Sequence, residues 1–209
     1  MANLEGISQA LQKGDQNTVV KLVKEAVAEG VSSKQILEVG LISGMGIIGG
    51  KFKRNEVYVP EVLIAARAMH GGLEILEPLL AQSGVQPVGR VVLGTVKGDL
   101  HDIGKNLVGM MLKGGGFAVI DLGTDVSPEK FVEAAKSTGK CIIAMSALLT
   151  TTMPQMANVV KAVKAAGLAG VKTMIGGAPV TQNYANEIGA DGYAPDAASA
   201  VDTAKSLVA

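Results

Sequence analysis

Aromatic residues and cysteine are scarce in this sequence of 209 residues, which has no Trp, three Tyr, three Phe and one Cys. Nucleobases stack on aromatic side chains, so this scarcity argues against a protein that binds single-stranded nucleic acid. The formal net charge is zero, and no basic patch is present to neutralise phosphates. We therefore expect no nucleic-acid partner.

The single cysteine, Cys141, cannot form an intramolecular disulfide, which fits a reducing compartment. It lies in the apolar run 141–145, where we expect a buried small side chain. The N-terminus lacks the basic region and apolar stretch of a signal peptide. Because no apolar run approaches the length of a membrane span, we expect a cytoplasmic protein with no membrane partner.

Histidine is also rare, with only His70 and His101 in the chain. Zinc sites use several Cys and His ligands, so a zinc enzyme is a poor interpretation. His70 falls in a helical pattern and is most simply a residue on the surface of a helix.

Hydrophobic residues make up 48% of the chain, enough for one large domain or two smaller ones. The first part predicts helices. Residues 17–29 place their apolar side chains on one face, Ser32 or Ser33 can cap the next helix, and Pro60 suits the first turn of another. With a short helix near 3–13, these patterns predict a four-helix bundle.

The polar stretch 82–89 contains Gly and Pro, and we place a boundary there between a helical domain (1–86) and a second domain (87–209). In the second domain short apolar runs alternate with amphipathic helices. The predicted strands are 90–96, 117–122, 141–146, 171–175 and 191–193, and the predicted helices are 103–113, 128–138, 153–166, 182–188 and 196–208. This alternation predicts an α/β fold with a doubly wound parallel sheet of five strands, which binds ligands beyond the carboxyl ends of its strands.

The candidate site residues follow the ends of these predicted strands. His101 offers an imidazole, a good ligand for a transition metal, and Asp99 can accept a hydrogen bond from its other ring nitrogen. Each feature alone has a simpler interpretation, such as a helix cap beside a surface imidazole. Their placement at one edge of the sheet favours a binding site.

The spacing of these residues resembles the cobalamin-binding module of methionine synthase, B12-dependent mutases and corrinoid methyl carriers. Residues 105–145 separate an Asp-x-His-x-x-Gly motif from Ser-x-Leu, and residues 149–175 separate Ser-x-Leu from Gly-Gly. The motif residues are Asp99, His101, Gly104, Ser146, Leu148, Gly176 and Gly177.

The first half resembles the helical cap that accompanies this module in methionine synthase and in the corrinoid proteins of methylamine and methanol metabolism. The matching segments are Gly44-Met45-Gly46-Ile47-Ile48-Gly49, Phe52 and Tyr58-Val59-Pro60-Glu61. An alternative is a bundle core with close helix contacts at the glycines. Mutase modules normally lack the cap, so its presence favours methyl transfer.

The resemblance implies a helical cap domain followed in the chain by a Rossmann- or flavodoxin-like cobalamin-binding domain. It implies cobalamin or a related corrinoid, such as methylcobalamin, bound base-off with His101 on the cobalt. Asp99 would hold His101, and Thr152 stands where methionine synthase has a serine that links this pair to solvent. The other implied cofactor-binding residues are Asp102, Ile103 and Gly104 near the ring, Ser146, Leu148, Thr150, Gly176 and Gly177 along the nucleotide tail, and Tyr193 and Ala194 at its far end.

The implied function is that of a methyl carrier without catalysis of its own. Cobalt(I) would accept a methyl group from a substrate methyltransferase, and methyl-cobalt(III) would pass it to an acceptor methyltransferase of the coenzyme M or tetrahydrofolate type. A reductive activation protein would be a third partner. One alternative is a B12-dependent sensor, which usually adds a DNA-binding domain, and another is a mutase subunit, which needs a substrate barrel from another chain.

Overall fold

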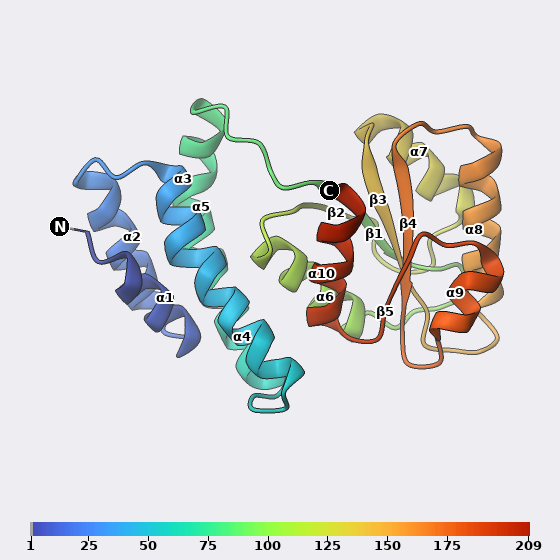
Figure 1. Ribbon diagram of the computed structural model, residues 1–209, viewed down its shortest axis with the longest axis horizontal. Coiled ribbons are helices and arrows are strands. Elements are labelled where there is room, and N and C mark those ends of the chain that lie inside the picture. The colour runs from blue at the N-terminus through green and yellow to red at the C-terminus, as the bar shows by residue number, and fades with distance from the viewer. Residues whose placement is uncertain (1) are drawn as a thin grey trace. The chain divides into compact units, whose positions relative to one another are not determined.

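The computed structural model describes residues 2–209, which form two compact units (Figure 1). One unit contains the residues up to Gln86 together with Gly114–Gly116, and the other contains Pro87–Lys113 and Phe117–Ala209. Each unit has buried apolar side chains of its own.

The first unit is helical. Its elements are α1 (Leu4–Gln12), α2 (Gln16–Ala28), α3 (Ser33–Gln35), the π-helical segment η1 (Ile36–Ile42), α4 (Ser43–Lys53) and α5 (Val59–Gln82). The backbone stays in the right-handed helical region at Ile36 and Ser43, so α3, η1 and α4 form one continuous helix. The described residues of this unit therefore make four helices, as predicted, although the third continues well beyond Leu41, to Lys53.

Local signals explain where these helices begin. The Ser32 hydroxyl accepts a hydrogen bond from the Gln35 N–H at 3.3 Å, and the Glu61 carboxylate accepts one from the Tyr58 N–H at 3.0 Å. A Cβ at Gly44 would lie 3.0 Å from the Ser8 carbonyl oxygen, so α4 approaches α1 closely there. Over residues 2–209, no helix is long and apolar enough to cross a membrane.

The second unit is a parallel sheet of five strands with helices between them. The strands are β1 (Arg90–Thr95), β2 (Ala118–Asp121), β3 (Cys141–Ser146), β4 (Val171–Gly176) and β5 (Gly192–Ala194), in the order β2-β1-β3-β4-β5. The helices are α6 (Ile103–Gly114), α7 (Pro128–Thr138), α8 (Pro154–Ala165), α9 (Gln182–Ile188) and α10 (Ala197–Val208). This strand order is that of a flavodoxin-like doubly wound sheet, so the predicted fold class is confirmed.

Helices cover both faces of the sheet, α6 and α10 on one and α7, α8 and α9 on the other (Figure 1). On the second face, Val92, Ile143 and Ile175 share a buried core with Phe131 of α7 and Met156 of α8. Burial on both faces explains why the strands are almost continuously apolar in sequence.

Candidate functional site

The last residues of four strands are aligned side by side at one edge of the sheet. Thr95 of β1 is in register with Ser146 of β3, Ser146 with Gly176 of β4, and Gly176 with Ala194 of β5. The chain changes direction of winding between β1 and β3, where doubly wound sheets form their ligand crevice. The structure therefore brings the loops that carry the predicted site residues to one edge.

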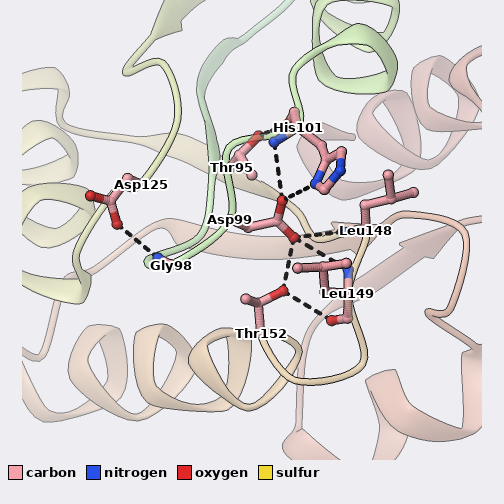
Figure 2. A network of polar contacts seen from close by, with 8 residues as sticks. All are labelled: Thr95, Gly98, Asp99, His101, Asp125, Leu148, Leu149 and Thr152. Carbon is pink, nitrogen blue, oxygen red and sulfur yellow. Dashed lines mark hydrogen bonds and ion pairs between the residues drawn. The ribbon is translucent and has the colours of Figure 1, made fainter.

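Asp99 and His101 lie in the loop between β1 and α6 and are hydrogen-bonded (Figure 2). His101 Nδ1 is 2.7 Å from Asp99 Oδ1, and the His101 backbone N–H donates to the same oxygen at 3.1 Å. The Asp99 side chain is fully buried, whereas the His101 side chain is 51% exposed. Since Asp99 engages Nδ1, Nε2 is the ring nitrogen left for a metal.

The second oxygen of Asp99 binds the loop after β3 (Figure 2). Asp99 Oδ2 accepts hydrogen bonds from the Leu148 N–H at 2.8 Å, the Leu149 N–H at 3.3 Å and the Thr152 hydroxyl at 2.8 Å. Burial raises the pKa of Asp99, but the hydrogen bonds from Leu148, His101 and Thr152 together hold it well below its usual range. The carboxylate is therefore ionised and can accept the proton of His101 Nδ1, and in that tautomer of the neutral ring Nε2 has the lone pair.

Thr152 contacts the ligand pair through a buried hydroxyl. Its Oγ1 lies 2.8 Å from Asp99 Oδ2 and 2.9 Å from the Leu149 carbonyl oxygen, and the residue is 7% exposed. The hydroxyl has one proton, so it can donate to only one of these two acceptors at a time. The link from the pair to solvent that the resemblance implied stays a prediction.

Large apolar side chains are exposed on the two loops that Asp99 joins and at the first residue of α6. The exposed fractions are 72% for Leu100, 79% for Ile103, 44% for Leu148 and 42% for Leu149. A Cβ at Gly104, in the first turn of α6, would meet no atom within 4 Å. Exposed apolar groups beside open space are typical of a ligand site, and this set fits a broad flat ring resting over an imidazole.

A single imidazole holds a metal ion firmly only when another molecule supplies the remaining ligands. In the described part of the chain, no group of three or more His, Cys, Asp and Glu residues could hold a metal ion. A corrin ring supplies its own nitrogen ligands to cobalt, so one axial histidine suffices. A single imidazole such as that of His101 is therefore chemically compatible with a corrinoid.

Gly176 and Gly177 have a role within the protein's own backbone. Gly177 has a φ of +130°, and a Cβ there would lie 1.9 Å from the Ala147 carbonyl oxygen. A Cβ at Gly176 would lie 2.9 Å from the Ala194 carbonyl oxygen. Close approach of neighbouring backbone thus requires both glycines, before any ligand is considered. Their place along a nucleotide tail stays a prediction, as it does for Ser146, Leu148, Thr150, Tyr193 and Ala194.

Three residues that sequence reasoning missed also shape the site. The Thr95 hydroxyl donates to the His101 carbonyl oxygen at 2.8 Å, and Asp125 Oδ1 accepts from the Gly98 N–H at 2.7 Å. Lys105 is buried in α6 and pairs with Asp121 at the end of β2. A lysine in an amphipathic helix is normally solvated, so nothing in the sequence marked its burial.

Comparison with known proteins identifies a B12 binding domain in each half of the chain. A family model described as a B12 binding domain matches residues 89–202, and a second B12 binding domain model matches residues 4–77. The chain is 42% identical over 215 residues to trimethylamine corrinoid protein 1 of Methanosarcina mazei, with 100% of both chains covered. It is 43% identical over 208 residues to dimethylamine corrinoid protein 1 of Methanosarcina acetivorans, covering 99% of this chain and 97% of that protein.

Solved structures give the same result. A cobalamin-binding protein from Desulfitobacterium hafniense superposes with a TM-score of 0.82 at 30% identity, with 100% of both chains covered. A chain of the methanol:cobalamin methyltransferase complex MtaBC from Methanosarcina barkeri superposes with a TM-score of 0.86 at 29% identity, covering 98% of this chain and 79% of that one. The protein therefore belongs to the corrinoid protein family, with a helical B12 binding domain followed by an α/β B12 binding domain.

Proposed function

We propose that this protein is a methyl carrier that binds a corrinoid with His101 on the cobalt and serves a methylamine or methanol methyltransferase system. Relatives that match over their whole length are trimethylamine and dimethylamine corrinoid proteins, which supports this assignment. The observation that carries it is the geometry at His101. Asp99 fixes Nδ1, so that Nε2 faces away from the buried carboxylate on a half-exposed ring.

When bound, a corrinoid would supply the cobalt chemistry by which a methyl group is accepted and released. The protein's residues position and tune the axial ligand. The ionised Asp99 keeps the proton on Nδ1 and raises the basicity of Nε2, because a negative charge beside the ring favours donation to a metal. Its bonds to Leu148 and Leu149 prevent the carboxylate from turning away.

The apolar side chains around His101 would contact the lower face of the ring. Leu100, Ile103 and Leu148 are exposed in the chain alone, and covering them with a flat apolar ligand would remove them from water. Water would then be excluded from the Nε2–cobalt bond. Asp102 and Gly104 follow His101 at the start of α6, so they lie near the same face.

The partners in this proposal are a substrate methyltransferase, an acceptor methyltransferase of the coenzyme M or tetrahydrofolate type and a reductive activation protein, all in the cytoplasm. The similarity to a chain of a methanol:cobalamin methyltransferase complex supports the first of these. A methyltransferase that co-purifies with this protein, assayed for methyl transfer from candidate methylamines and methanol, would identify the donor.

Loading the purified protein with hydroxocobalamin tests the ligand assignment. We expect the visible spectrum of cobalamin with its own base displaced and an imidazole on cobalt, and we expect His101→Ala to lose the imidazole signature. His70→Ala is the matched control, because His70 is exposed on α5 beside Glu74. A wild-type spectrum with dimethylbenzimidazole still on the metal would contradict the proposal.

A further inference from the structure

Thr95 holds the backbone of His101 from a buried position at the end of β1. It is the last residue of β1, it is fully buried, and its hydroxyl donates to the His101 carbonyl oxygen at 2.8 Å (Figure 2). The hydrogen bond spans six positions of the chain and closes the loop before α6 into a ring. A buried hydroxyl in a strand needs such a partner, and here the partner is the residue that carries the metal ligand.

The sheet fixes Thr95 itself. Its backbone N–H donates to the Gly123 carbonyl oxygen at 2.9 Å, and its carbonyl oxygen accepts from the Val126 N–H at 2.9 Å. It also lies in register with Ser146 of β3. The position of Thr95 is therefore fixed, and its hydroxyl can hold the loop between β1 and α6 in place.

Asp99 and Thr95 each fix a different part of His101. Asp99 binds the ring at Nδ1 and the His101 N–H, so it sets the rotation of the side chain. Thr95 binds the carbonyl group on the other side of His101, so it sets how far the backbone stands from the edge of the sheet. Metal ligands must be placed to within about 0.5 Å, which a loop does not achieve without such supports.

We propose that Thr95 is a positioning residue that sets the reach of His101 toward cobalt, and with it the fraction of bound corrinoid in which His101 is the axial ligand. This inference rests on the proposed function, because it needs a corrinoid in the site. It does not require Thr95 to touch the cofactor.

Replacing Thr95 with valine removes the hydroxyl and keeps the shape, whereas serine keeps the hydroxyl. The protein is loaded with cobalamin, reduced to cobalt(II), and examined by electron paramagnetic resonance with histidine labelled with the heavy nitrogen isotope. The isotope changes the splitting only where a protein histidine is on the metal. We expect Thr95→Val to lower the ratio of His-ligated to unligated cobalt by about fivefold, the effect of one net hydrogen bond, and Thr95→Ser to retain the wild-type ratio.

Thr173→Val is a matched control in the same sheet. Thr173 is also buried in a parallel strand, and its hydroxyl bonds to Asp191 at 2.9 Å, away from the His101 loop. Its replacement should lower the melting temperature without changing the isotope effect.

Amide hydrogen exchange of the apoprotein gives a reading that does not involve the cofactor. Peptides covering 96–102 should exchange faster in Thr95→Val than in Thr95→Ser, with peptides from β3 unchanged.

The results distinguish a failure of the proposed function from a failure of the role proposed for Thr95. If wild-type protein binds cobalamin but shows no isotope effect, the proposed function is wrong and this inference with it. If wild type shows the effect, and Thr95→Val keeps both the wild-type ratio and wild-type loop exchange, only the role of Thr95 is wrong. If Thr95→Val does not fold, Thr95→Ser and Thr95→Ala are compared, and equal ratios in these two variants would overturn the proposal.

Discussion

The Asp99 carboxylate accepts a hydrogen bond from the Leu148 backbone N–H at 2.8 Å, although the two residues are 49 positions apart. This bond ties the loop after β1 to the loop after β3 at the point where the sheet changes its direction of winding. The same carboxylate holds His101. The carboxylate that would position the metal ligand therefore also stabilises the fold, so substitutions of Asp99 should affect stability as well as corrinoid binding.

Asp99→Asn should destabilise the apoprotein in a pH-dependent way. The asparagine NH₂ group would face backbone donors, at a cost of about 2–4 kcal/mol near neutral pH. Because the pKa of folded Asp99 lies below its unfolded value, its contribution is full above that value and is lost as the pH falls toward the folded pKa. The unfolded chain takes up this proton below about pH 4, so wild-type stability falls there by up to about 1.4 kcal/mol per pH unit from this group alone.

Urea unfolding of both proteins between neutral and acidic pH would measure the difference, in which the contributions of other carboxylates cancel. The gap should be widest near pH 7 and should narrow as the solution is acidified below about pH 5. A gap that stays constant would mean that Asp99 titrates in the folded protein as it does in the unfolded chain.

Thr152 should act through its hydroxyl more than through its methyl group. Thr152→Val removes the single hydroxyl proton that either Asp99 Oδ2 or the Leu149 carbonyl oxygen can accept, which we expect to cost about 1–2 kcal/mol. Thr152→Ser retains the donor and should cost less. Denaturation midpoints of the two variants check this order, and a serine variant that is the less stable of the two would show that methyl packing dominates.

Sequence reasoning predicted most of the fold because each element carries local signals. The strands are apolar on both faces, helices such as α7 begin with a capping residue, Ser127 here, and chain order places the loops at one edge. The Asp99–His101 bond also follows from a spacing of two residues. The bonds from Thr95 and Asp125 were missed, because they join residues whose proximity depends on strand register and on a positive φ at Asp125. The sequence predicted that Gly177 lets a ligand approach the backbone. In the structure a Cβ at this position would collide with the Ala147 carbonyl oxygen, a contact that the sequence alone does not reveal.

The segment between α5 and β1 should be the first site of proteolysis. Residues 83–89 lie outside helix and strand, and most of them are exposed. If 1–86 and 87–209 are separate domains, brief digestion should cut within this segment and leave two resistant fragments. Mass spectrometry of the fragments checks this. First cuts within β1 or α6 would contradict the boundary.

Gly104→Ala should affect the stability of the apoprotein and its affinity for cobalamin in different ways. The added Cβ would meet no atom within 4 Å in the protein, and alanine favours helix, so the apoprotein should be as stable as wild type or slightly more so. If a corrin ring lies against the first turn of α6, the same methyl group overpacks that contact by about 1–3 kcal/mol, and cobalamin affinity should fall by about five- to hundredfold.

Gly109→Ala, in the same helix, should behave in the opposite way. Its Cβ would lie 3.0 Å from Leu93 Cδ2 of β1, and Leu93 is buried, so overpacking should offset the helix-propensity gain and lower stability relative to Gly104→Ala, with near-normal affinity once the protein is folded. Thermal unfolding of the apoproteins and cobalamin titration of both variants give the four values required. Wild-type affinity in Gly104→Ala would place the ring away from the start of α6, because no contact within the protein itself absorbs the added methyl group.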